Sequence, residues 1–172
     1  FVGNIKKHKG LHTLIAAFKL LLNDYPDIKL FIVGNSENFR TNDTSLLNDI
    51  QNLPSENIQF TGKISDKELK ELYKTTTVLV QPSLYEGFGM PPLEALSLGT
   101  NVVLSDIPVF KEIYKDYPVS FFHCEDSNDL YLTLKNNWQD FSKPINSLPD
   151  IYSFNKTYDI IINQIKEILK WK

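Results

Sequence analysis

The sequence predicts an α/β protein built on a doubly wound parallel sheet (Rossmann-like), and three observations carry this prediction. Short apolar runs of strand length alternate with stretches of helical spacing along the chain. A parallel crossover needs a dozen or more residues and is usually a helix, so this alternation favours parallel strands. The 172 residues, 42% hydrophobic and 23% charged, suit a single soluble domain with one core.

The expected elements follow in order. Strands are expected at residues 29–34, 58–60, 77–81, 101–104 and 119–122, with a first strand ending at Val2. Helices are expected over residues 11–22, where apolar side chains form one stripe, from a capping box of Ser65 and Glu68, over residues 91–98, and near Phe110. Two prolines in residues 143–150 indicate a connection, so we assign 142–172 to a connection plus a terminal helix.

Charge and cysteine content exclude several classes of protein. With 18 Lys and Arg against 21 Asp and Glu, the net charge of −3 gives no general attraction to nucleic acid or an anionic membrane. A single cysteine without Cys/His clusters argues against disulfides and structural zinc, which favours a cytoplasmic location. The chain opens at Phe1 with no charged leader, so we expect a piece of a longer protein without a signal peptide.

A basic loop is expected at the end of the first strand. Ligands of an open parallel sheet bind at the carboxyl ends of its strands. Residues 3–10 (GNIKKHKG) hold Lys6, Lys7 and Lys9 directly ahead of a helix, whose N-terminus adds about half a positive charge and free N–H donors. The loop therefore suits a phosphate or diphosphate, and a solvated basic loop without a ligand is the alternative.

A second loop, residues 82–94 (PSLYEGFGMPPLE), leads from a buried strand into a helix expected to start near Pro91, with Glu94 in its first turn. Gly87 and Gly89 permit a tight turn and close approach of a ligand to the main chain. The N–H groups that such a ligand meets are those of Phe88, Gly89, Met90 and Leu93, because the two prolines have none.

Glu86 and Glu94 bracket this turn, and paired carboxylates suit the vicinal hydroxyls of a sugar. Each charge-assisted hydrogen bond of this kind is worth about 1.5 to 3 kcal/mol. The helix dipole gives Glu94 a purely structural alternative. A glycoside hydrolase with the two glutamates as acid and base is a further alternative, as is a structural Rossmann-like domain. Phosphate-loop and dinucleotide motifs are absent, which argues against nucleotide hydrolases and dehydrogenases.

Residues 60–106 resemble the C-terminal domain of the retaining glycosyltransferases that include glycogen and sucrose synthases and many lipopolysaccharide and capsule mannosyltransferases. The signature of that family, two glutamates separated by seven residues, is present as Glu86 and Glu94, and the likeness extends over residues 1–129. The resemblance implies one half of a GT-B architecture, in which two Rossmann-like domains face each other across a cleft. Residues 1–172 would form the nucleotide-sugar-binding C-terminal domain, with the N-terminal acceptor domain absent from this chain.

The resemblance also implies roles for individual residues. Lys9 and Glu86 would be catalytic, with Lys9 on the donor diphosphate and Glu86 on hydroxyls of the transferred sugar, while Glu94 would hold the ribose. The main chain around Lys63 and Ile64 would lie against the base. The remaining implied donor-binding residues are Asn4, Gly87, Phe88, Gly89, Met90 and Leu93. Many relatives have arginine where this chain has Asn4, and Lys6 or Lys7 would supply the missing charge.

For the whole protein, the resemblance implies transfer of a sugar with retention from a nucleotide-diphosphate sugar to an acceptor hydroxyl, in surface polysaccharide biosynthesis. No metal ion or cofactor is expected. The acceptor glycan or lipid-linked glycan would bind the N-terminal domain, which would also provide any peripheral contact with the inner membrane face. This fragment alone is expected to transfer no sugar. The alternative function is a noncatalytic module that binds nucleotides or sugar phosphates.

Overall fold

The computed structural model describes residues 1–34 and 44–142, so the connection and last helix expected over 143–172 lie outside the described residues. Its strands are β1 (Leu30–Val33), β2 (Ile58–Gly62), β3 (Val78–Gln81), β4 (Asn101–Ser105) and β5 (Val119–Phe122). Its α-helices are α1 (Leu11–Asp24), α2 (Thr44–Gln51), α3 (Asp66–Thr75), α4 (Met90–Ser97), α5 (Pro108–Tyr114) and α6 (Ser127–Asn137). Two 3-10 turns, η1 (Lys7–Lys9) and η3 (Asp140–Ser142), complete the described elements.

The strands pair in parallel throughout, which confirms the predicted fold class. β1 pairs with β2, and β3, β4 and β5 form a second parallel group in that order. The strand expected to end at Val2 is reduced to a single parallel bridge between Val2 and Val33. Crossover helices follow β2, β3 and β4, as the alternation in the sequence predicts.

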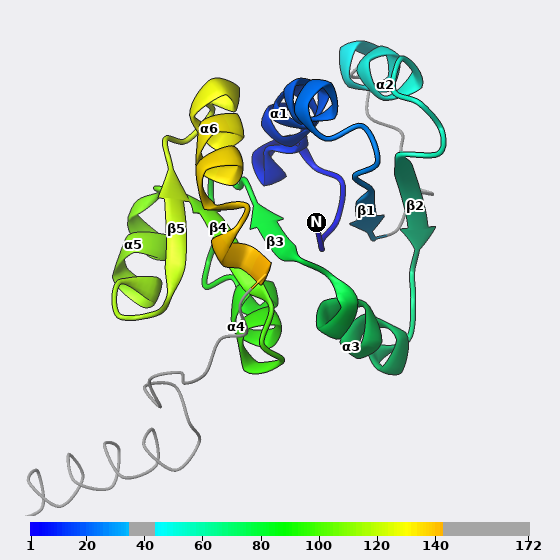
Figure 1. Cartoon of the computed structure of the whole chain (residues 1–172). Coiled ribbons are helices and arrows are strands. Elements are labelled where there is room, and N and C mark those ends of the chain that lie inside the picture. Colours follow the sequence, from blue (N-terminus) through cyan, green and yellow to red (C-terminus); the bar gives the residue numbers. More distant parts are fainter. Residues whose placement is uncertain (35–43, 143–172) are drawn as a thin grey trace, which may run out of the picture.

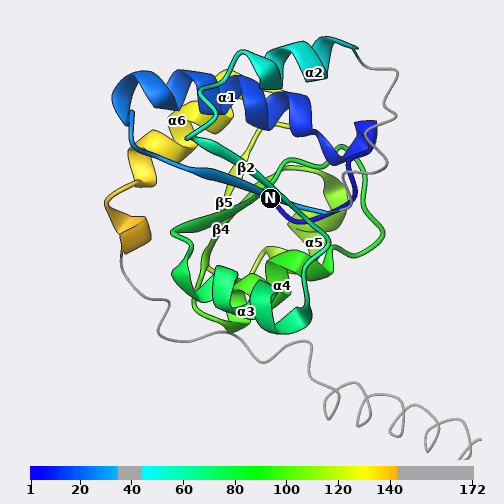
Figure 2. The same cartoon turned by 90° about the vertical axis from the view of Figure 1, so that its right-hand side faces the viewer.

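Helices cover both faces of the strands, as Figure 2 shows, with α1, α2 and α6 above and α3 and α4 below. Successive strand residues point to opposite faces, so they feed two separate apolar clusters. In β4, Val103 packs with α1 and α6, whereas Val102 and Leu104 pack with α3, α4 and α5. The loops of interest follow strand ends, since residues 3–10 come after the Val2 bridge and residues 82–94 come after β3.

Local signals explain where helices begin. The predicted capping box is present: Glu68 N–H donates to the Ser65 hydroxyl, and the Glu68 carboxylate accepts from Ser65 N–H, so α3 begins at Asp66. Helices α2 and α6 were not predicted. In α6, the Asp126 carboxylate accepts from two N–H groups of the first turn, and Leu130 and Leu134 face the core one turn apart.

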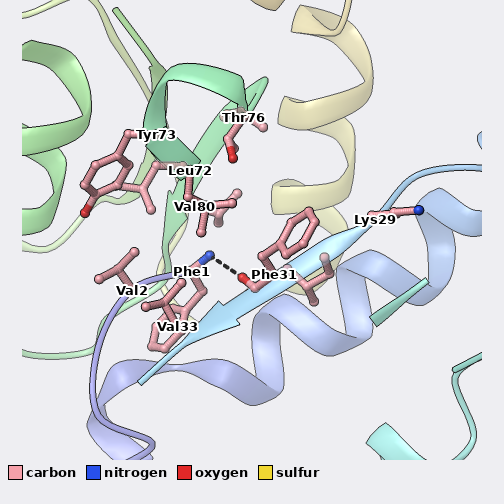
Figure 3. A pocket seen from close by; sticks show the side chains of 12 residues that line it. Phe1, Val2, Lys29, Phe31, Val33, Leu72, Tyr73, Thr76 and Val80 are labelled. Atoms are coloured by element: carbon pink, nitrogen blue, oxygen red, sulfur yellow. Dashed lines mark hydrogen bonds between the residues drawn. The ribbon is translucent and has the colours of Figure 1, made fainter. Parts of the chain in front are cut away.

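A narrow apolar groove separates the two groups of strands. Phe1 N–H donates to the Phe31 carbonyl at 2.9 Å, and Phe1 accepts from Val33 N–H, so the first residues run alongside β1. A cavity of about 60 Å³ lies beside them, lined by β1, β3 and the C-terminal turn of α3 (Figure 3). This groove lies away from the loops that carry the predicted site.

Candidate active site

The basic loop and the glutamate loop, predicted from separate parts of the sequence, pack directly against each other. Leu84 N–H donates to the His8 carbonyl at 2.8 Å. Gly10 has a left-handed φ of +68°, and a Cβ built there would lie 1.8 Å from the Pro82 carbonyl oxygen. Only glycine fits such a contact, so Gly10 sets how closely the two loops approach.

This packing brings together the two residues assigned catalytic roles. Lys9 Nζ lies 2.6 Å from Glu86 Oε1, and the side chains are only 19% and 10% exposed. The Ser83 hydroxyl donates to the same oxygen at 2.8 Å, and Gln81 Nε2 lies 3.5 Å from it. Within the described part of the chain, the donors to this carboxylate all reach Oε1, so Oε2 can accept a further hydrogen bond.

Ser83 and Gln81 are site residues that the sequence reasoning missed. Both are buried at the carboxyl end of β3, and the Ser83 carbonyl in turn accepts from the Ser105 hydroxyl at the end of β4. Among described side chains, Gln81 Oε1 is the buried polar atom without a hydrogen-bond partner. A signal was present, because Gln81 and Ser83 are polar residues at the end of an apolar strand, where only proline separates them.

Side chains of α5 hold the turn between the two glutamates in place. Gly89 is the N-cap of α4 with φ +83°, and the Tyr114 hydroxyl donates to its carbonyl. A Cβ at Gly89 would lie 2.6 Å from the Phe110 ring. The helix begins at Met90, which agrees with the predicted start near Pro91. The prediction that Glu94 lies in its first turn was wrong: Glu94 lies in the second turn, where the helix dipole explains it less well.

Glu94 turns toward α3 rather than toward Lys9. The Tyr73 hydroxyl lies 3.3 Å from Glu94 Oε2, and both residues line an opening of about 270 Å³ between α3 and α4. Burial, together with the neighbouring Glu94 carboxylate, raises the pKa of the Tyr73 phenol. The phenol therefore stays protonated and acts as a hydrogen-bond donor.

The other predicted residues come from three segments of the chain, and most of them are exposed. Asn4, Lys6 and Lys7 are exposed in the first loop. Lys63 is exposed and Ile64 is half-buried, in the connection from β2 to α3. Between the glutamates, Gly87, Phe88 and Met90 are exposed, Leu93 is half-buried, and Gly89 is buried.

The described residues contain neither a metal-binding cluster nor a membrane-spanning helix. Within 1–34 and 44–142, no three His, Cys, Asp or Glu side chains are grouped so as to hold a metal ion. Over the same ranges, no helix has the length and apolar character needed to cross a membrane.

Comparison with known proteins gives the family. The family described as "Glycosyl transferases group 1" matches residues 1–167. The chain belongs to this family. This confirms the resemblance to group 1 glycosyltransferases that the two glutamates and the basic loop suggested.

The relatives of this chain include a longer mannosyltransferase. It is 32% identical over 157 residues to the O-antigen chain mannosyltransferase RfbU of Salmonella typhimurium, a match that covers 91% of this chain and 40% of that protein. This group 1 chain thus spans less than half of that relative's length.

Solved structures show the same domain fold. The C-terminal domain of a group 1 glycosyl transferase (LpcC) from Francisella tularensis matches with a TM-score of 0.70 and 25% identity, over 81% of this chain and 74% of that one. Sucrose-phosphate synthase from Thermosynechococcus elongatus matches with a TM-score of 0.69 and 27% identity, over 82% of this chain and 36% of that one. The fold is therefore the Rossmann-like domain of GT-B glycosyltransferases.

Proposed function

We propose that this chain is the donor-binding domain of a retaining glycosyltransferase, which transfers a sugar from a nucleotide-diphosphate sugar to an acceptor hydroxyl. The observation that carries the proposal is the 2.6 Å contact between Lys9 and Glu86, made by two loops at the carboxyl ends of parallel strands. Membership of the group 1 family supports it.

In this proposal Lys9 and the N-terminus of α1 bind the diphosphate. Lys9 and Gly10 lead straight into α1, which begins at Leu11, so an ammonium group and the N-terminus of a helix lie next to each other. Both stabilise the negative charge that develops as the bond from the anomeric carbon to the diphosphate breaks. The proposal needs no metal ion, because these groups already supply positive charge.

Each of the two glutamates binds a different part of the donor. Glu86 Oε1 is occupied by Lys9 and Ser83, so Oε2 accepts from a hydroxyl of the transferred sugar. Glu94, on the α3 side of α4, accepts from the ribose hydroxyls. The N–H groups of Phe88 and Gly89 contact the sugar or phosphate. The main chain at Lys63 and Ile64 contacts the base.

The whole protein is proposed to build a surface polysaccharide at the cytoplasmic side of the membrane. The supporting observation is the match to an O-antigen chain mannosyltransferase, which is longer than this chain. An N-terminal domain would bind the acceptor glycan or lipid-linked glycan, and the present chain without it would transfer no sugar.

The proposal is tested by a thermal-shift panel of UDP, GDP and ADP and their sugar conjugates, followed by calorimetry. One nucleotide class should stabilise the chain, by about 2.7 kcal/mol at a hundred times its Kd. Glu94→Ala should weaken binding of that nucleotide about tenfold, since it removes a charge-assisted hydrogen bond. Glu112→Ala, at an exposed glutamate of α5, is the control. Unchanged affinity in Glu94→Ala would count against the proposal.

A further inference from the structure

Tyr73 is held rigidly although its hydroxyl reaches the edge of the opening between α3 and α4. Its side chain is 3% exposed and packs with Leu79, Ala95 and Leu96 in the core below the strands. Its carbonyl accepts from the buried Thr100 hydroxyl at 2.6 Å, which ties the end of α3 to the start of β4. The position of the phenol is therefore fixed by the core.

Glu94, in contrast, is an exposed residue in the second turn of α4. A carboxylate in that position samples several rotamers unless a partner restrains it, and fixing those rotamers opposes ligand binding. In the described part of the chain, the partner that reaches Glu94 is the Tyr73 hydroxyl, 3.3 Å from Oε2. That contact takes one carboxylate oxygen and leaves Oε1 without a donor.

The surroundings of this pair suit a polar ligand. The opening of about 270 Å³ that Tyr73 and Glu94 line is also lined by polar Asp66, Lys70 and Ser97 and by apolar Leu69 and Leu98. A buried phenol seldom lacks a hydrogen-bond partner, so Tyr73 and Glu94 are coupled whether or not a ligand is present.

We propose that Tyr73 is a positioning residue that holds Glu94 Oε2 and so presents Oε1 to the ribose of the donor nucleotide. This inference rests on the proposed function. It adds a residue of α3, outside the two loops, to the group that sets affinity for the ribose hydroxyls. The raised pKa of the phenol keeps it protonated, and so a hydrogen-bond donor, at neutral pH.

The test is Tyr73→Phe, which removes the hydroxyl and keeps the ring in the core. The probe is whichever of UDP, GDP and ADP binds the unaltered chain, together with the 2′,3′-dideoxy form of the same diphosphate. Tyr73→Phe should weaken binding of the ribose form about three- to tenfold. Binding of the dideoxy form should stay unchanged, because it has no hydroxyls for Glu94 to accept from.

Tyr131→Phe is the matched control, since Tyr131 also donates to a carboxylate, Asp24, but on the surface shared by α1 and α6. Its affinity for both probes should equal that of the unaltered chain. A general structural defect in Tyr73→Phe would weaken both probes equally and would overturn the inference, as would unchanged or tighter binding of the ribose form.

Glu94→Ala separates this inference from the function on which it rests. If Glu94→Ala weakens ribose binding and Tyr73→Phe does not, the donor site stands and the positioning role fails. If neither variant changes binding, or none of the three diphosphates binds, both fail. In the double variant the Tyr73 change should add no further loss, because its effect runs through Glu94.

Discussion

Gly10 is the residue on which the geometry of the candidate site depends most directly. It has nearly the same φ as Gly62, +68° against +69°, but a Cβ at Gly10 would meet the Pro82 carbonyl at 1.8 Å, whereas a Cβ at Gly62 would meet nothing within 4 Å. The two glycines therefore separate the cost of backbone strain from the cost of a steric clash.

Gly10→Ala should destabilise the chain by about 3 kcal/mol or more, because strain and clash add. Gly62→Ala should cost only about 1 to 2 kcal/mol, the strain of a left-handed alanine. Urea unfolding of both variants measures the difference. Equal losses in the two variants would show that the loops do not meet at Gly10 as described.

At the residue scale, sequence reasoning predicted which residue types form the site but not their mutual contacts. Glu86 was expected to face a sugar and Lys9 a diphosphate, and in the ligand-free structure each is the other's partner. Lys9 and Glu86 are 77 residues apart, and nothing in the sequence indicates that two such distant positions are in contact. The supporting donors Ser83 and Gln81 were missed because one hydroxyl and one amide in an apolar stretch are seldom distinctive.

At the scale of elements, the strongly periodic segments were predictable and the weakly periodic ones were not. α1 shows a full apolar stripe and α3 a capping box, and both are present where predicted. α6 is rich in asparagine and has only Leu130 and Leu134 buried, so its pattern is too sparse to stand out. The strand expected to end at Val2 is only a bridge, because the backbone hydrogen bonds between residues 1–3 and β1 are confined to Phe31 and Val33.

At the scale of the whole molecule, α1, α2 and α6 lie on one side of the strands and α3 and α4 on the other (Figure 1). The fold class could be predicted because strand and helix signals alternate along the sequence, and family membership agrees with it. The chain spans 40% of its Salmonella relative, so acceptor binding and transfer belong to a longer protein in this account. In the proposed function, this chain binds the donor.

As proposed, donor binding depends on Lys9 more than on any other side chain, and calorimetric titration of a nucleoside diphosphate into Lys9→Met tests it most directly. Lys19→Met, which breaks an ion pair between α1 and α2, is the control. Lys9→Met combined with Glu86→Gln avoids leaving a carboxylate unpaired and checks that the fold is intact. We predict that both Lys9 variants lose about tenfold or more in affinity while Lys19→Met loses none. An unchanged Kd in folded Lys9 variants would contradict the account.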